Sequence, residues 1–172
     1  MAVRHRIVPQ LLSCSCAGSA YFRNCISATG ISPLFNEPIE VRFLDTVLGP
    51  KGTFQYIYNV QPKKRPEFAK GSHYDYHYSD EWTLAEWHVD FATQTYELFI
   101  NGHPIKDASF TKGAGNFEKS EIPQALQSIS FGWNNYQPAG EGFTAWIDDI
   151  ALGKDRIGER GLVAEPKERQ GK

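Results

Sequence analysis

A length of 172 residues suits one domain built on a single core and leaves no room for a second full domain. Eighteen basic against twenty acidic residues give a formal charge of −2, which excludes the strong positive field that gathers nucleic acid. No apolar run reaches the roughly 18 residues that a membrane-spanning helix needs, so we expect a soluble chain with neither nucleic acid nor a membrane span among its partners.

The first thirty residues differ in composition from the rest, because they hold three arginines, all three cysteines and no acidic residue. A basic start, a short apolar segment and the small residues at 17–20 resemble a secretory signal, and Leu-Leu-Ser-Cys at 11–14 resembles a lipoprotein cleavage box. Either would place the protein outside the cell or in the cell envelope. We favour the alternative, a poorly ordered leader or a start site upstream of the domain, which leaves a cytoplasmic location open.

From residue 37 onward the pattern is one of strands and turns, with aromatic residues, Gly and Pro in plenty and little helical periodicity. We predict seven strands, over 39–47, 53–60, 73–78, 83–92, 95–101, 126–133 and 142–152. Seven strands are enough for two facing sheets. The expected domains are a leader over 1–36, a β-sandwich over 37–157 and a charged tail over 158–172.

The clearest unit is a hairpin that begins at Trp87. Alternating apolar and polar residues predict that Trp87, Val89 and Phe91 face the core. After the second strand, Asn101-Gly102 favours a type I′ turn, because both positions adopt positive φ at low cost. The return strand near Pro104 is then expected at a sheet edge.

Four segments in this order resemble the concanavalin A-like lectin/glucanase superfamily, and its laminin-G-like and polysaccharide-lyase-like branches most closely. They are Trp-His-Val-Asp at 87–90, Tyr-Glu-Leu-Phe-Ile-Asn-Gly at 96–102, Ile-Ser-Phe-Gly at 129–132 and Ile-Asp-Asp-Ile-Ala-Leu at 147–152. The resemblance covers residues 41 to 157 and implies an all-β, antiparallel two-sheet jelly roll. It supports the fold better than any activity.

The last of these segments contains Asp148 and Asp149, which point to opposite faces in an extended chain. The resemblance implies a calcium ligand in the closing strand, joined by carbonyl oxygens from the first strand region, and assigns it to Asp148 or Asp149. Calcium takes roughly six to eight oxygens, so these two residues cannot supply the site alone. The alternative is an Asp that accepts backbone hydrogen bonds at a sheet edge.

Two segments have the residue types that bind a polysaccharide or glycan, since aromatic rings cover the apolar side of a sugar while amides and carboxylates bind its hydroxyls. Residues 73–78 alternate His, Asp and His with three tyrosines, and residues 133–137 combine two rings with three amides. The alternative is that the tyrosines form cross-strand core pairs and the amides build turns. The candidate contacts are Tyr74, Tyr76, His77, Trp133, Asn134, Asn135, Tyr136 and Gln137.

Catalysis has weaker support. Glycosidases of this fold group their carboxylates on one strand, and the sequence has no such triplet. A lyase would use His77 or Tyr76 as its base, but the Gln-x-His and arginine-rich segments of the lyases are absent. We therefore predict a carbohydrate-binding, lectin-like module without its own catalysis. The alternatives are a small polysaccharide lyase or glycoside hydrolase of the same fold, and a laminin-G-like protein-interaction domain.

Overall fold

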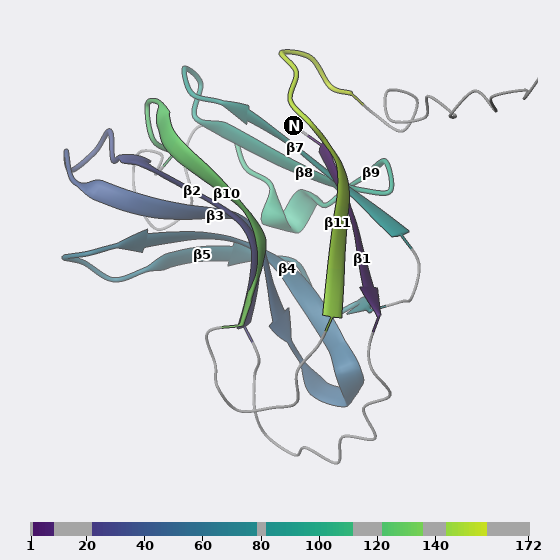
Figure 1. The fold of residues 1–172 in the computed structure, drawn as a ribbon. Coiled ribbons are helices and arrows are strands. Elements are labelled where there is room, and N and C mark those ends of the chain that lie inside the picture. The colour runs from purple at the N-terminus through teal and green to yellow at the C-terminus, as the bar shows by residue number, and fades with distance from the viewer. Residues whose placement is uncertain (1, 9–21, 79–81, 112–121, 136–143, 158–172) are drawn as a thin grey trace, which may run out of the picture.

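The fold is almost entirely β-structure. The computed structural model (Figure 1) describes residues 2–8, 22–78, 82–111, 122–135 and 144–157, with side chains for 26–78, 82–111, 122–132, 147 and 150–157. Within these residues the chain forms eleven strands and two 3₁₀ helices of three residues each. No helix in the described part is long and apolar enough to cross a membrane. The predicted all-β class is confirmed.

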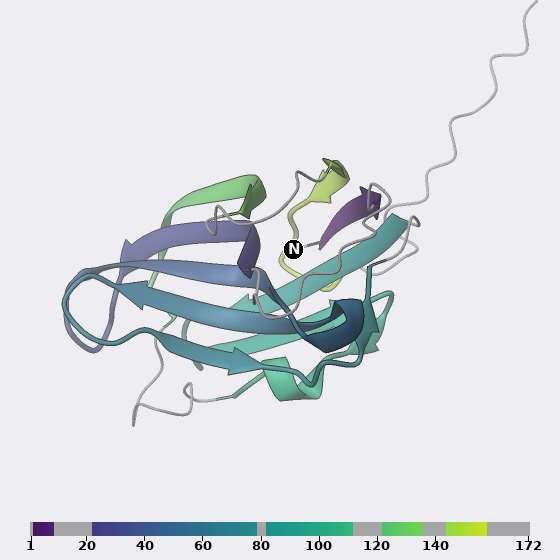
Figure 2. The ribbon, with the colours of Figure 1, turned by 90° about the horizontal axis from the view of Figure 1, so that it is seen from below.

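The strands form two antiparallel sheets. Sheet A has the order β11-β1-β7-β8-β9, and sheet B has the order β10-β2-β3-β4-β5, with β6 pairing with the start of β4. Figure 2 shows the strands of sheet B side by side, from β10 in green to β4 and β5 in blue. Sheet A consists of β1 (Ala2–Val8), β7 (Trp82–Asp90), β8 (Thr95–Ile100), β9 (His103–Pro104) and β11 (Thr144–Ala151). Sheet B consists of β2 (Phe22–Ile31), β3 (Pro38–Leu48), β4 (Thr53–Pro62), β5 (Phe68–Gly71), β6 (Tyr76–His77) and β10 (Leu126–Asn135).

The N-terminal region contributes a strand to each sheet. β1 lies between β11 and β7, and β2 lies between β10 and β3. Neither strand is predicted from the sequence, in which residues 1–36 have the composition of a leader. β2 nevertheless alternates as a half-buried strand must, with Ile26 and Ala28 buried while Thr29 is exposed. The small and polar residues of β2 conceal this period in the sequence.

An aromatic cluster joins the two sheets. Phe43 of β3 packs against Trp87 of β7 and Tyr96 of β8, with ring centroids 6.5 and 6.0 Å apart. Tyr58 of β4 lies 4.7 Å from Tyr96 between centroids, and the Tyr96 hydroxyl donates a hydrogen bond to the Phe43 carbonyl. All four side chains are buried. Rings from both sheets therefore share one apolar layer, as in a β-sandwich.

The hairpin of β7 and β8 is present as predicted, with one error at its tip. Trp87 is buried and Val89 packs against the core. Phe91 was expected to face the core, and this is wrong, because its side chain is 37% exposed. β7 ends at Asp90, whose carboxylate accepts two backbone N–H groups of the following turn. That turn takes Phe91 out of the strand alternation.

The predicted turn after β8 is confirmed. Asn101 and Gly102 have φ angles of 48° and 77°, both positive as a type I′ turn requires. β9 follows at once and pairs with β8 through Phe99 and Pro104. It forms the edge of sheet A, where the proline removes no ladder hydrogen bond.

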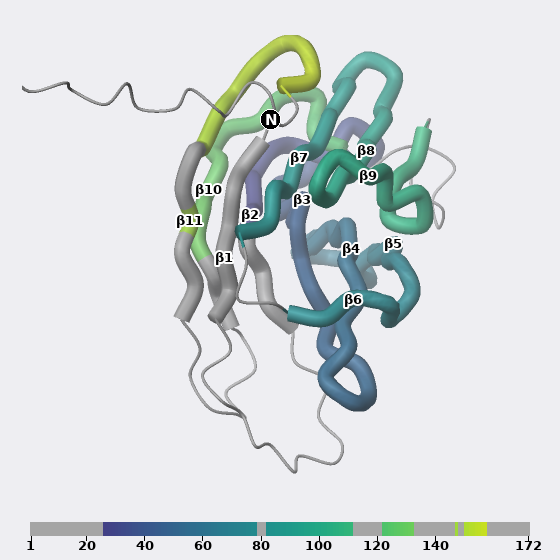
Figure 3. The backbone as a smooth tube through the Cα atoms, turned by 90° about the vertical axis from the view of Figure 1, so that its right-hand side faces the viewer, coloured from purple at the N-terminus to yellow at the C-terminus, as the bar shows by residue number. Residues whose placement is uncertain are grey.

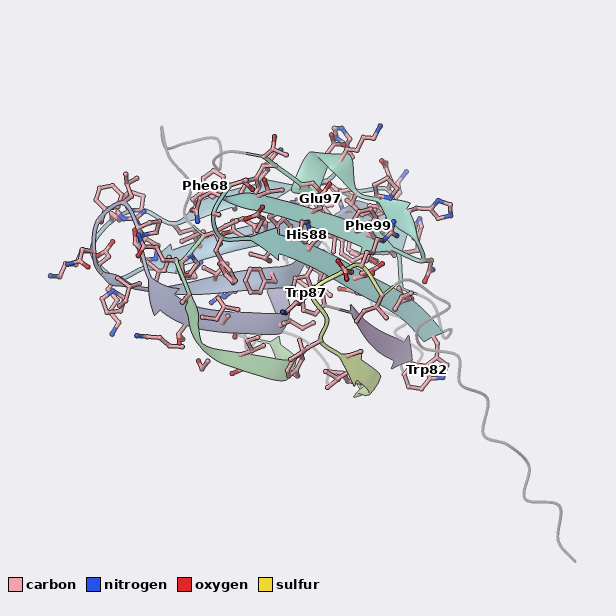
Figure 4. The ribbon with its side chains drawn as sticks, turned by 90° about the horizontal axis from the view of Figure 1, so that it is seen from above. Phe68, Trp82, Trp87, His88, Glu97 and Phe99 are labelled. Carbon is pink, nitrogen blue, oxygen red and sulfur yellow. The ribbon has the colours of Figure 1, made fainter. Side chains whose placement is uncertain are left out.

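The last described residues fold back over the outer face of sheet A. Glu86 of β7 lies opposite Phe99 of β8, yet is only 2% exposed. Its carboxylate accepts hydrogen bonds from Arg156 Nε and from the Ile157 amide, each 2.9 Å long. The Arg156 guanidinium also lies 3.8 Å from the centroid of the Phe99 ring, which Figure 4 labels, and donates to the Gly102 carbonyl. The buried charge of Glu86 is thus compensated by the C-terminal segment.

We expect Arg156→Ala to lower the free energy of unfolding by about 1–3 kcal/mol, since it removes a charged donor from a buried carboxylate. Urea denaturation measures the loss. Lys154→Ala is the matched control, because Lys154 is exposed in the same segment. Equal losses in the two variants would contradict a stabilising role for the contact between Arg156 and Glu86.

Candidate functional site

The outer face of sheet B is polar. Along β3 and β4, alternate residues enter the core, and those between them point outward. Most of the outward residues carry carboxylates, amides, hydroxyls or a guanidinium, while Ile57 and Val47 on the same side are apolar and buried. We call the polar members of this surface the polar face. Its members are Ser27 and Thr29 of β2, Glu40, Arg42 and Asp45 of β3, Gln55, Asn59 and Gln61 of β4, Glu67 beside β5, and Ser128 and Ser130 of β10.

A bulge in β3 places three of these charges together. Arg42 pairs with Asn59 and Asp45 pairs with Ile57, so β3 has one residue more than β4 in this interval. The extra residue keeps Arg42 and Asp45 on the same face although their spacing is odd. Arg42 lies 3.1 Å from Glu40, between Nε and Oε1, and 3.7 Å from Asp45, between Nη1 and Oδ2. Because the Asp45 side chain is fully buried, the guanidinium compensates a charge that would otherwise be costly.

A second network lies between β4 and β5. Asn59 is only 2% exposed. Its Nδ2 donates to Glu67 Oε1 at 2.9 Å, and its Oδ1 accepts from Gln61 Nε2 at 2.8 Å. Gln61 also donates to the other oxygen of Glu67. The buried amide therefore holds two more accessible polar groups in fixed orientations.

Tyr74 closes one end of the polar face with an exposed ring. Its hydroxyl accepts a hydrogen bond from Gln55 Nε2 at 2.9 Å, and its side chain is 43% exposed. The ring lies over Gly49, where an added Cβ would be 2.3 Å from Tyr74 Cδ1. Gln55 in turn lies over Gly71, where a Cβ would be 2.8 Å from Oε1. Two glycines thus leave room for a flat apolar surface beside hydrogen-bonding groups.

The predicted tyrosine ladder divides into two parts. Tyr76 and Tyr78 pack beside β4, with ring centroids 4.7 Å from Tyr56 and 4.3 Å from Phe54 respectively. These two tyrosines therefore pair with aromatic residues of β4 and pack against the core, as in the alternative to ligand contact. Tyr74 instead bonds to the polar face, so the three tyrosines do not share one environment. The reason is that β6 is only two residues long and the chain before it is not a strand.

The environment of Tyr76 does not suit a general base. Burial, and then the charges of Asp75 and Asp107, raise the pKa of the Tyr76 phenol above its ordinary value. A phenol is already protonated at neutral pH with its ordinary pKa of about 10, and the raised pKa keeps Tyr76 in that form. His77 is exposed, and it is His73 whose Nε2 lies 3.5 Å from Asp107 Oδ2.

The second predicted contact group belongs to the opposite edge of sheet B. Trp133, Asn134 and Asn135 are the last three residues of β10. Their side chains, and all of Tyr136 and Gln137, lie outside the described residues. In sheet B, β2, β3 and β4 lie between β10 and β6 (Figure 3). Four inter-strand spacings correspond to ~19 Å. A single ligand would reach from Tyr74 to this group only if it contained several sugar units.

The predicted calcium ligands lie in a different sheet from the polar face. Asp148 and Asp149 belong to β11, an edge strand of sheet A, and their side chains are outside the described set. Among the side chains that are described, no group of three or more His, Cys, Asp or Glu residues could hold a metal ion. Calcium binding at Asp148 or Asp149 therefore stays a prediction.

If that prediction is right, millimolar calcium will raise the Tm and a chelator will reverse the gain, because an ion that binds only the native state stabilises it. Differential scanning fluorimetry measures the shift. Asp148→Asn and Asp149→Asn, tested separately, identify which carboxylate is the ligand. An unchanged Tm at millimolar calcium removes the assignment.

The polar face is not among the sites predicted from the sequence, although its pattern is present there. Glu40 and Arg42 alternate with apolar residues, as do Gln55, Asn59 and Gln61. The sequence predicts a strand over 53–60, and the polar residues of that strand did not lead to a predicted site. The polar half has the same period of two and indicates a second, hydrogen-bonding face.

Comparison of the chain with protein-family models, with curated proteins and with solved structures finds no significant match. The functional proposal therefore depends on the geometry and chemistry of the polar face.

Proposed function

We propose that the protein is a carbohydrate-binding, lectin-like module without catalysis of its own, built as a concanavalin A-like jelly roll. The observation that carries the proposal is the polar face of sheet B, where amides and carboxylates are already hydrogen-bonded to one another. This face ends at the exposed ring of Tyr74. The ligand would be a polysaccharide or glycan.

A sugar needs two kinds of contact at once, and the polar face offers both. The ring of Tyr74 covers the apolar C–H side of one pyranose, and the Gln55 amide beside it binds hydroxyls of that sugar. Gln61 and Glu67 lie toward the other end of β4, about 20 Å away along an extended strand, and would bind hydroxyls of further units of the same polysaccharide. The side chains of Asn59, Gln61 and Glu67 are held by one another before a ligand arrives. Binding would therefore cost little side-chain entropy.

The enzymatic alternatives draw less support from the described residues. An elimination mechanism would use Tyr76 or His77 as its base, and burial with two nearby carboxylates raises the pKa of Tyr76. That shift favours the protonated phenol, which is the wrong form for abstracting a proton at neutral pH. Binding without turnover is the simpler use of these residues.

The group from Trp133 to Gln137 belongs to the same proposal as a second contact region. Trp133, Asn134 and Asn135 lie in β10 of sheet B, the sheet that also holds Gln55, and the two rings and three amides in the sequence of 133–137 repeat the chemistry of the polar face. An extracellular or cell-envelope location would give such a module access to polysaccharide. The second contact region and the extracellular location both rest on predictions from the sequence.

We expect Tyr74→Ala to weaken glycan binding roughly threefold to tenfold, which corresponds to about 0.5–1.5 kcal/mol for one aromatic contact. The Tm should change little because the ring is exposed. A glycan array identifies the ligand, calorimetry measures the affinity, and absorbance of unsaturated uronates is followed in parallel.

Phe91→Ala is the matched control, since Phe91 is an aromatic residue of similar exposure at the tip of the β7–β8 hairpin. Gly49→Ala tests the same site without removing the ring, because its Cβ would displace Tyr74. Product formation in the absorbance assay would favour a lyase. Equal affinity in Tyr74→Ala and Phe91→Ala would remove Tyr74 from the site.

A further inference from the structure

We propose that the ligand of the polar face is an uncharged polysaccharide rather than an acidic one, an inference that rests on the proposed function and adds the class of ligand. Acidic glycans carry carboxylates or sulfates, and proteins bind such groups most effectively with the planar fork of arginine. The class of ligand can therefore be inferred from the ion pairs that the arginines and carboxylates near this face already form.

Each of the three arginines whose side chains are described is held by a carboxylate of the protein itself. The pairs are Arg42 with Glu40 at 3.1 Å, Arg65 with Glu37 at 2.7 Å, and Arg156 with Glu86 at 2.9 Å. Only Arg42 belongs to the polar face, and it also lies 3.7 Å from the fully buried carboxylate of Asp45. Turning Arg42 toward an acidic ligand would leave that buried charge without its guanidinium, which is costly.

The remaining charge of the polar face is unfavourable to an anion. Its described residues include three carboxylates, those of Glu40, Asp45 and Glu67, against the one guanidinium of Arg42. At the stacking surface the exposed Asp75 directly follows Tyr74, and the exposed Lys51 lies two residues from Gly49, against which the ring packs, so this surface adds no net positive charge. An acidic sugar placed on that ring would lie within a Debye length of the Asp75 carboxylate, about 8–10 Å in ordinary buffers.

The exposed lysines of the β4–β5 turn lie far from Tyr74. Lys63 and Lys64 follow the end of β4, whereas Gln55, which binds the Tyr74 hydroxyl, lies near its start. The eight residues from Gln55 to Lys63 span about 27 Å in an extended strand. At that distance the lysine charges are screened by salt.

The groups left to contact a ligand are neutral or accept hydrogen bonds. Gln55 and Gln61 both donate and accept, and Thr29 and Ser128 present hydroxyls that already bond to each other at 2.7 Å. Such groups match the hydroxyls of an uncharged sugar, and the ring of Tyr74 matches its C–H side.

The test compares uncharged and acidic hexasaccharides on the full chain by calorimetry. Cellohexaose, laminarihexaose, xylohexaose and mannohexaose form the uncharged set, and hexagalacturonate and hexamannuronate form the acidic set. We expect at least one uncharged hexamer to bind at least tenfold more tightly than either acidic one. Its affinity should change less than twofold between 20 and 300 mM NaCl, roughly as expected for a contact without ion pairs.

Tighter binding of an acidic hexamer, weakened by salt, would overturn the inference and leave the proposed carbohydrate-binding function intact. Binding of neither set would instead overturn the proposed function, and the inference with it. Asp75→Lys tests the electrostatic cause. It should raise the affinity for the acidic hexamers about threefold, the effect of one surface charge pair, and leave the affinity for the uncharged ligand unchanged. No gain for the acidic hexamers in Asp75→Lys would contradict charge repulsion and overturn the inference.

Discussion

Phe43 projects from sheet B between two rings of sheet A, and the packing of the two sheets depends on this contact. Trp87 lies on β7 and Tyr96 on β8, the two strands of one hairpin, and Tyr96 also donates a hydrogen bond to the Phe43 carbonyl. That bond satisfies the hydroxyl of a fully buried side chain, and burial also raises the pKa of Tyr96. The apolar contact and the hydrogen bond thus fix the same pair of strands.

The same short part of β3 connects the core with the polar face. Phe43 and Leu44 are consecutive in the chain and both are buried in the core, because the bulge lies between Arg42 and Asp45. As a result Asp45 returns to the face that Arg42 occupies, and their charges meet. Core packing at Phe43 therefore sets the position of the charged groups on the opposite side of the sheet.

Much of the fold follows from patterns of period two. The strands of the β7–β8 hairpin, the type I′ turn at Asn101 and the edge position of β9 all follow from local alternation and turn chemistry. β2 does not, because Ser27, Thr29 and Gly30 give its alternation little apolar contrast. Phe91 has the right period but lies beyond the last residue of the strand, where the Asp90 carboxylate closes a turn.

The candidate site is only partly predictable for a different reason. Tyr74 is exposed whereas Tyr76 and Tyr78 are packed, because β6 begins only at Tyr76. The alternation in the sequence does not determine where such a short strand begins. The charge cluster of Arg42 depends on a bulge. In the sequence this bulge shows only as the apolar pair Phe43-Leu44, which interrupts the alternation but does not reveal that Arg42 and Asp45 share a face. The resemblance to lectin-like jelly rolls predicts a glycan ligand, whereas the residues that would hold it follow from the geometry of sheet B.

The most direct test of this account is the stability of Phe43→Ala, followed by far-UV and near-UV circular dichroism during urea denaturation. Removing a ring that packs against both sheets should lower the free energy of unfolding by about 3–5 kcal/mol. Both circular dichroism signals should change in one cooperative transition. A loss below about 1 kcal/mol, well under the range for a buried aromatic side chain, would contradict the account. So would separate transitions for secondary structure and aromatic packing, because the two sheets would then not depend on a shared core.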